Sequence, residues 1–363
     1  QDGIAQERVE KLFYDLCTVI ESIKTPNDYP KVFIPANRKG SRYEFLDEHF
    51  SLGKQIGKGA NGSVYLGTFG HKKSTTEIAI KINNPKKANL VEDAAEILVQ
   101  THLFCYVRDH LPAARRNLQH IMLAPIARVP KPYFAASVAS LGRVVGMEKL
   151  EKSLLKTVLA ASSCKERILI LRNALSKLAR LLYFLQHELH FMHGDFHAEN
   201  VMFHGSEVYI IDYGMSSFQY KHENRQYTDD RYEGTRFNPY LDLLTLISSL
   251  REDLGDEGHI VSSRWCDQII KPFWDAVKAG MKTPGAGPGK YNTRATVKAA
   301  IGEISYSGEI YYAHHTLYQY AEYIHYPATS PLGLLRALDK VSDNIPRTVM
   351  PYKSRIFGGM NEA

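Results

Sequence analysis

The sequence predicts an α+β protein with two lobes, a small strand-rich lobe followed by a larger, mainly helical one. Between about residue 50 and residue 83, short runs of alternating or β-branched residues are separated by glycine and polar breaks, which is typical of strands. Residues 165–190 carry leucine and isoleucine at helical intervals, the pattern of a buried helix face. After residue 239 the pattern remains mostly helical, and 363 residues suffice for two modest domains or one large two-lobed domain.

The composition is that of an ordinary soluble globular protein, with 44% apolar and 23% charged residues. The net charge of +6 is spread along the chain, which argues against a sequence-specific nucleic-acid binder and weakly favours an anionic ligand such as a phosphate ester. No apolar run reaches about eighteen residues, so we expect no membrane span. We expect a cytoplasmic or nuclear location, because no Sec signal peptide is visible and four distant cysteines without a CxxC pair predict neither a disulfide framework nor a zinc ribbon.

The changes in pattern divide the chain into four predicted parts. Residues 1–45 form an N-terminal helical extension, because residues 5–24 space their apolar positions as an amphipathic helix does. Residues 46–147 form the small lobe, which contains the strands and one helix. Residues 148–150 are a connector, and residues 151–363 form the helical lobe.

A glycine-rich stretch in the small lobe supplies Gly57, Gly59 and Gly62, followed by Val64. Glycines let a turn close over phosphates without Cβ clashes and present N–H groups to anionic oxygens. Strand residues follow the motif, whereas a dinucleotide-binding loop would open a helix. We therefore predict a phosphate-cradling hairpin.

Lys81 is predicted to lie on a strand, on the face opposite to Ile80 and Ile82. A shielded lysine needs an anionic partner. We expect it to bind phosphate and to pair with a carboxylate of the following helix, with Glu96 as the first candidate and Glu92, one turn earlier, as the reserve.

A polar stretch reads His-Gly-Asp-Phe-His-Ala-Glu-Asn from His193 to Asn200, and Asp212 follows an apolar strand twelve residues later. Together with the preceding motifs, residues 50–250 resemble the protein kinase family. "GKGANGSV" is similar to its glycine-rich loop, Lys81 to its strand-three lysine, "HGDFHAEN" to its catalytic loop, and "DYG" at residues 212–214 to D-F-G.

This resemblance implies a bilobal protein-kinase-like fold, with a small antiparallel sheet and one helix in the first lobe. It also implies transfer of the γ-phosphoryl group of ATP with Mg²⁺. Asp195 would orient the acceptor hydroxyl, while Asn200 and Asp212 would hold Mg²⁺. Further nucleotide contacts are expected from Ala79, from Met147 as gatekeeper, and from the backbone of Glu148 and Leu150.

Several positions depart from the family's pattern. Gly194 replaces the arginine that would pair with a phosphorylated activation loop, so the resemblance implies activity without that phosphorylation. His197 replaces the lysine of Ser/Thr kinases and, if protonated, could contact the γ-phosphate. Tyr213 replaces the phenylalanine of D-F-G, the A-P-E motif is missing, and Asp242 is expected to brace the catalytic loop.

We expect a Ser/Thr protein kinase with ATP and a protein as partners, and two alternatives remain. His-Gly-Asp also occurs in aminoglycoside and choline kinases, whose acceptors are small molecules. A pseudokinase scaffold is the other alternative, although all four residues expected to act in phosphoryl transfer are retained. We expect the tyrosine and histidine side chains of residues 305–326 to pack between helices. Four hydroxyl-bearing residues are candidate phosphorylation sites: Tyr227, Thr228, Tyr232 and Thr235.

Overall fold

A computed structural model describes residues 34–45, 47–58, 62–71, 74–84, 90–117, 124–219, 226–227, 241–269 and 331–341. The chain divides into two compact units, and each unit combines two segments. The first unit is Gln1–Lys152 with Met202–Asp229, and the second is Ser153–Val201 with Asp230–Ala363. None of the described helices is both long and apolar enough to cross a bilayer.

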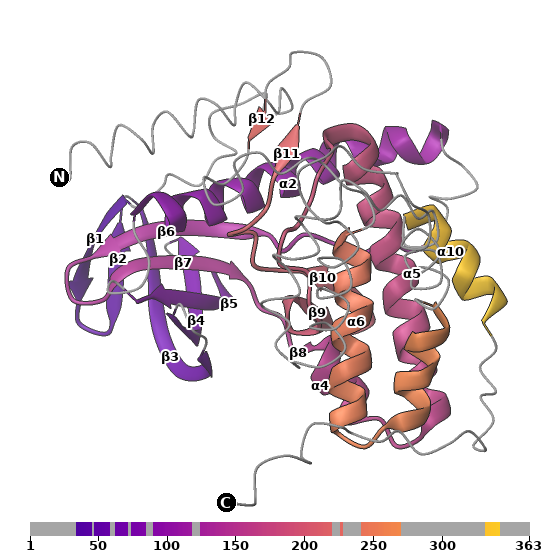
Figure 1. The fold of residues 1–363 in the computed structure, drawn as a ribbon. Coiled ribbons are helices and arrows are strands. Elements are labelled where there is room, and N and C mark those ends of the chain that lie inside the picture. Colours follow the sequence, from indigo (N-terminus) through magenta and orange to yellow (C-terminus); the bar gives the residue numbers. More distant parts are fainter. Residues whose placement is uncertain are drawn as a thin grey trace, which may run out of the picture. The chain divides into compact units, whose positions relative to one another are not determined.

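The first unit contains a closed barrel of seven strands in the order β1-β2-β3-β4-β5-β7-β6 (Figure 1). Neighbouring strands are antiparallel except for β1 and β6, which pair in parallel with Ile34 opposite Ala136. The strands are β1 (Ile34–Lys39), β2 (Arg42–Phe45), β3 (Glu48–Lys58), β4 (Gly62–His71), β5 (Ser74–Asn83), β6 (Pro132–Val138) and β7 (Gly142–Glu148).

The predicted fold class, a bilobal kinase fold with a small antiparallel sheet, is wrong for this structure. The sheet closes on itself through the parallel pair β1–β6, and its first two strands lie in residues 34–45, which the sequence analysis assigned to a helical extension. A two-residue connection joins β1 to β2, and Gly40 adopts there a φ of 64°, which favours glycine. The pairing of β1 with β6 closes the barrel, and β1 and β2 add Ala36, Tyr43 and Phe45 to its interior.

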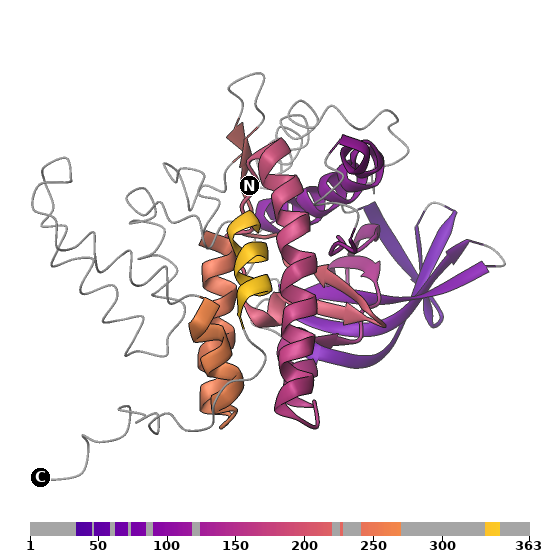
Figure 2. The same cartoon turned by 90° about the vertical axis from the view of Figure 1, so that its right-hand side faces the viewer.

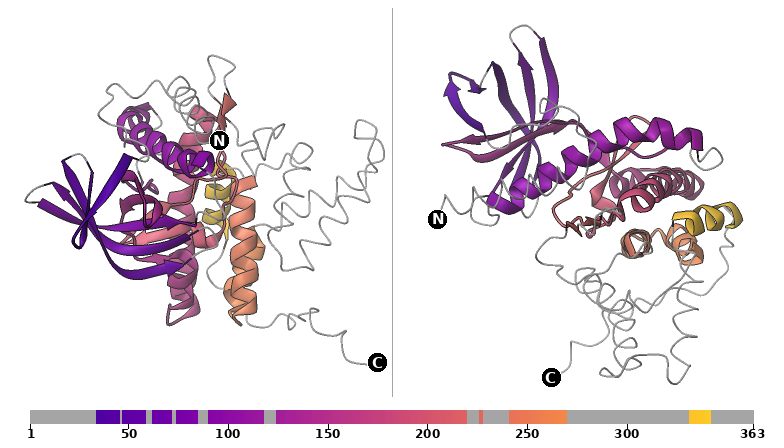
Figure 3. Two further views of the ribbon diagram at one scale, coloured as in Figure 1. Left: turned by 90° about the vertical axis from the view of Figure 1, so that its left-hand side faces the viewer. Right: turned by 90° about the horizontal axis from the view of Figure 1, so that it is seen from above.

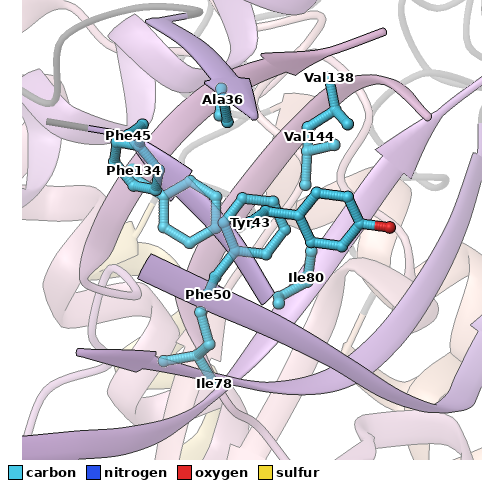
Figure 4. Packing of buried hydrophobic residues seen from close by; sticks show 10 residues of the cluster. Ala36, Tyr43, Phe45, Phe50, Ile78, Ile80, Phe134, Val138 and Val144 are labelled. Atoms are coloured by element: carbon cyan, nitrogen blue, oxygen red, sulfur yellow. The ribbon is translucent and has the colours of Figure 1, made fainter. Parts of the chain in front are cut away.

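The barrel interior is filled by aromatic rings together with isoleucine, valine and alanine side chains (Figure 4). Phe50 stacks on Tyr43 and on Phe134, with ring centroids 4.9 and 4.7 Å apart. Ile78 and Ile80 of β5 point into the same cluster and are fully buried. Because side chains alternate along a strand, Ala79 and Lys81 belong to the outer face of β5.

Helix α2 (Leu90–Asn117) covers part of that outer face (Figure 1). Its Ile97 forms a small buried cluster with Ala135 of β6 and Val145 of β7, and Met147 packs against this cluster. In the register of β5 with β7, Lys81 lies opposite Val145. Cross-strand partners share a face, so Lys81 lies on the side of the sheet that α2 covers.

The second unit is helical. Helix α5 (Cys164–Leu189) confirms the predicted stripe, because Ile168, Leu171, Leu175, Leu178, Leu182 and Leu185 are all buried. Helix α10 (Pro331–Lys340) lies along α5 (Figure 2). Arg172 of α5 donates hydrogen bonds to the carbonyls of Leu338 and Val341 at the C-terminal end of α10. Helix α6 (Leu241–Asp256) and the helix over residues 260–269 run side by side (Figure 3).

Short elements complete the described chain. They are α4 (Leu154–Leu159), the 3₁₀ turn η2 (Ala198–Asn200), a sheet in the order β10-β9-β8, and the pair β11 (Phe218–Gln219) and β12 (Gln226–Tyr227). The sheet consists of β8 (Lys152–Ser153), β9 (Val201–His204) and β10 (Glu207–Ile210), and β9 lies between β8 and β10.

Some predictions lie outside the described residues. These are the N-terminal helix over residues 5–24, the packing of residues 305–326, Gly59, and the candidate modification sites Thr228, Tyr232 and Thr235. Among the cysteines that the structure describes, Cys105, Cys164 and Cys266 do not take part in a disulfide.

Candidate active site

A lysine–glutamate ion pair joins the barrel to helix α2. Both oxygens of the Glu96 carboxylate accept hydrogen bonds from Lys81 Nζ, at 2.6 and 2.7 Å. The two side chains are only 15% and 18% exposed, so solvent screens the pair weakly. The structure thus pairs Lys81 with the first candidate, Glu96, whereas the side chain of Glu92 lies outside the described residues.

Asp212 adds a second negative charge beside this pair. Burial lowers the pKa of Lys81, but the carboxylates of Glu96 and Asp212 outweigh burial and raise it above its ordinary value. Burial also raises the pKa of Glu96, against the effect of Lys81. The ammonium of Lys81 is therefore firmly held in its charged form.

Asp212 has a φ of 63°, in the left-handed region that is uncommon for residues other than glycine. The next residue, Tyr213, is fully buried, and its hydroxyl donates to the carbonyl of Ile210 at 2.8 Å. This bond satisfies the hydroxyl that tyrosine adds relative to phenylalanine. Backbone strain of this kind occurs mostly at functional sites.

The glycine-rich stretch forms the predicted hairpin between β3 and β4, with Gly57 opposite Val64 and Gly62 opposite Asn83 in the strand registers. A Cβ atom on Gly62 would lie 2.4 Å from the carbonyl oxygen of Ile82. Only glycine therefore allows β4 to approach β5 this closely, two residues from Lys81.

The predicted connector lies where β7 ends. Met147 is opposite Ala79 of β5 in the strand register, so both lie on the face that carries Lys81. The Glu148 N–H already donates to the Lys131 carbonyl at 2.8 Å, so this N–H is engaged within the protein. Leu150 is buried.

The Glu148 side chain bridges two positions that the sequence analysis missed. Its carboxylate accepts hydrogen bonds from the Tyr209 hydroxyl at 2.9 Å and from the Lys131 N–H at 3.0 Å. Burial, together with the bond to Glu148, raises the pKa of Tyr209 to about 12. Glu148 therefore orders the connector through its side chain.

The second unit holds the stretch from His193 to Asn200 in a compact turn. Gly194 has a φ of 80°, which glycine adopts without steric cost and which explains its presence there. The Asn200 side-chain nitrogen donates to the Asp195 carbonyl at 2.8 Å. A carbonyl oxygen only accepts hydrogen bonds, so the amide oxygen of Asn200 is the atom that could bind a cation.

Asp242, at the start of α6, stabilises this turn through its carboxylate. Its carboxylate accepts hydrogen bonds from the N–H groups of His193 and Gly194, at 2.9 and 3.2 Å. Burial raises the pKa of Asp242, while His193 lowers it. These contacts agree with the bracing role that the sequence suggested for Asp242.

His197 lies beside Asp195 in the same turn. Its Nδ1 accepts the Glu199 N–H at 3.3 Å, so the ring proton of the neutral form is on Nε2, which lies 3.7 Å from Asp195 Oδ2. Burial raises the pKa of Asp253 on α6, and the nearby His197 lowers it. The ring therefore interacts with a carboxylate of α6 as well as with Asp195.

The predicted site residues thus form two clusters. Lys81, Glu96 and Asp212 come together in the first unit, and Asp195, His197 and Asn200 come together in the second. Three residues next to Lys81 were missed by the sequence analysis: Asn83, Asp93 and Arg143. The one available signal was the spacing of Asp93, three residues before Glu96 on the same helix face.

Residues 77–220 match the sequence model of the phosphotransferase enzyme family (APH). This range contains Lys81, Glu96, Asp195, Asn200 and Asp212. The similarity is to kinase-like phosphotransferases, a broader class than the protein kinase family that the motifs suggested. No curated protein matches the chain. The family match supports a phosphotransferase activity.

Proposed function

We propose that this protein transfers the γ-phosphoryl group of ATP to the hydroxyl of an acceptor, with Mg²⁺ as the metal. The observation that carries the proposal is the cluster of Lys81, Glu96 and Asp212, within the residues that match the phosphotransferase family. Phosphoryl transfer depends mainly on positioning and on neutralising charge, which a fixed ammonium and a carboxylate provide.

The charges of this cluster support a cationic ligand. Lys81 pairs with Glu96, and Arg143 pairs with Asp93. Asp212 is then the carboxylate of the cluster without an ion pair among the described residues. Carboxylate and amide oxygens in small number suit Mg²⁺, and Mg²⁺ bound there would neutralise phosphate charge.

One N–H group of the Lys81 ammonium is available to donate a hydrogen bond to a phosphate. Its ammonium carries three N–H groups, and Glu96 accepts two of them. The third would contact a phosphate oxygen, while Glu96 keeps the ammonium in place. The hairpin with Gly57, Gly59 and Gly62, followed by Val64, would cover the phosphates, and Ala79, Met147, Glu148 and Leu150 would surround the base.

In the second unit, we assign Asp195 to orienting the acceptor hydroxyl and receiving its proton. Asn200 would contribute its amide oxygen to the metal. His197 would meet the transferred phosphate through Nε2–H, which points toward the Asp195 carboxylate. With Gly194 in place of an arginine, the turn is held by Asp242, which supports activity independent of activation-loop phosphorylation.

For the acceptor, we propose the hydroxyl of a small molecule. The match to the phosphotransferase enzyme family and the His-Gly-Asp sequence support this choice. A Ser or Thr hydroxyl of a protein is the second candidate, because the three-glycine hairpin is complete and is typical of protein kinases.

Labelled ATP offered to a pool of small alcohols and, separately, to a protein mixture tests the proposal. We expect Mg²⁺-dependent labelling in the small-alcohol pool, and a fall of about 10²–10⁴-fold in Asp195→Asn, because loss of a general base typically costs this much. Asp212→Asn should lose Mg²⁺-dependent turnover. Asp256→Asn, an exposed position at the end of α6, is the matched control and should keep full activity.

Labelling of proteins alone would favour the second candidate acceptor. Equal labelling by wild type and Asp195→Asn would contradict the assignment of Asp195.

A further inference from the structure

A second ion pair lies next to Lys81 and Glu96. Arg143 Nε donates to Asp93 Oδ2, and the side chain of Asn83 donates another hydrogen bond to Asp93. Asp93 is only 4% exposed and Asn83 only 3%. A carboxylate this deeply buried is stable only when its oxygens are paired.

All the partners lie on one face of the sheet. Lys81 is opposite Val145 in the register of β5 with β7, and Arg143 is two residues from Val145 on β7. Asn83 is two residues from Lys81 on β5. Since side chains alternate, Lys81, Asn83 and Arg143 all point to the side that α2 covers.

The acceptors lie on one face of α2. Asp93 and Glu96 are three residues apart and are therefore neighbours on the helix surface. Asp93 lies in the first turn of α2, which begins at Leu90. The first turn is thus attached to β7 and β5 through Asp93, and the next turn is attached to β5 through Glu96.

We infer that Arg143, Asp93 and Asn83 form a positioning clamp that holds the start of α2 so that Glu96 stays on Lys81. The inference rests on the proposed function only in giving Lys81 a role in binding phosphate.

The charge balance gives the physical reason for the clamp. Asp212 and Asp93 both act on Glu96 as like charges, which opposes its approach to the cluster. Arg143 neutralises Asp93, whereas burial raises the pKa of Asp93. Without Arg143, the buried Asp93 carboxylate would move toward solvent or take up a proton, and in either case the ion pair that ties the first turn of α2 to β7 would be lost.

The test measures the acylation rate of Lys81 at fixed pH by mass spectrometry, and it needs no catalytic activity. Glu96→Gln sets the upper limit of the acylation rate. Loss of the Glu96 charge lowers the pKa of Lys81 and raises the fraction of neutral amine, which is the form that reacts. A pKa lower by one unit gives about tenfold faster acylation. We expect about tenfold acceleration in Arg143→Gln, and a rate near that of wild type in Arg143→Lys, which keeps the charge.

Two controls separate the clamp from general destabilisation. Glu44→Gln removes an exposed ion pair with Lys39 on the same barrel and should leave Lys81 unchanged. Lys177 in α5 is buried, so its acylation should stay slow in every variant that remains folded. Faster acylation of Lys177 would report unfolding of the second unit. If Arg143→Gln also exposes Lys177, the same measurement is made on Asn83→Ala, which removes a clamp contact without changing any charge. Faster acylation of Lys81 with Lys177 still slow then supports the clamp, and an unchanged rate for Lys81 contradicts it.

Unchanged acylation of Lys81 in Arg143→Gln, alongside faster acylation in Glu96→Gln, would overturn the inference. Absence of phosphoryl transfer by the wild type would contradict the proposed function without affecting this result, so the two failures can be told apart.

Discussion

The two clusters of candidate site residues are held by different kinds of interaction. Around Lys81, side chains with opposite charges join strands of the barrel to helix α2, through Glu96 and Asp93. Around Asp195, main-chain N–H groups dominate, because Asp242 binds the N–H groups of His193 and Gly194. The first cluster therefore depends on charge balance, and the second depends on the shape of one turn.

This difference predicts different responses to substitution. In the first cluster, replacing a charged residue by a neutral one of the same shape should be destabilising, because it leaves the opposite charge of a buried ion pair without its partner. In the second cluster, loss of a hydrogen-bond acceptor should matter more than loss of charge, because the groups it binds are uncharged.

The largest effect on stability is expected from Asp242→Ala. The variant leaves two buried N–H groups unpaired, and we expect the free energy of unfolding to fall by about 2–4 kcal/mol. Asp242→Asn keeps an acceptor oxygen and should lose less. Chemical denaturation measures both, with the exposed Asp256→Ala as the control. Equal losses in Asp242→Ala and Asp256→Ala would show that the turn does not depend on Asp242.

A smaller effect is expected from the close approach of strands beside Lys81. Gly62→Ala places a Cβ 2.4 Å from the carbonyl oxygen of Ile82, a backbone atom that cannot move independently. We expect a loss of about 1–3 kcal/mol in the free energy of unfolding, typical of overpacking. Gly57→Ala is the matched control, since its Cβ would meet only Val64 at 3.6 Å. Similar denaturation midpoints for both variants would contradict the steric argument.

The most gradual effect concerns pH. His102 in α2 is fully buried, and its Nδ1–H donates to the Leu98 carbonyl at 2.7 Å. Burial lowers the pKa of His102 to about 4, from about 6.5 in the unfolded chain. Between these values the unfolded state binds more protons, so this contribution to stability is complete above about pH 6.5 and is lost as the pH falls toward 4, by up to about 1.4 kcal/mol per pH unit.

Asp242 should respond to acid with the opposite sign. Burial raises its pKa in the folded state, so the native protein binds a proton more readily and gains stability as the pH falls through that raised value. Denaturation curves from pH 7 to 4.5 on wild type, His102→Gln and Asp242→Asn separate the two contributions. We expect a shallower loss of stability in acid for His102→Gln and a steeper loss for Asp242→Asn. Parallel curves for wild type and His102→Gln would contradict the assignment to His102.

Local patterns predicted much of the second unit and of the individual elements. The leucine stripe of α5 and the glycine-rich hairpin both depend on neighbours within a few residues, so periodicity and turn residues reveal them. The residue types of Lys81, Asp195 and Asp212 likewise indicated phosphate chemistry before any geometry was known.

Barrel closure was not predictable in this way. It depends on the parallel pairing of β1 with β6, which joins residues about a hundred positions apart, Ile34 with Ala136. Strand β1 has only six residues, and these were predicted to belong to the N-terminal helical extension. Which strands pair depends on packing across the whole barrel, and the local sequence pattern of one strand does not determine its partner.

By itself, the sequence determined which chemical groups are present and which local turns carry them: an ammonium on a strand, carboxylates after an apolar strand and within a glycine-containing turn, and a helix face for burial. Only the tertiary structure decided that Glu96 meets Lys81, that Arg143 meets Asp93 fifty residues away, and that the sheet closes into a barrel. The reason is physical: ion pairs and strand partners form between elements whose distance in space is set by register and packing, and neither can be read from separation along the chain.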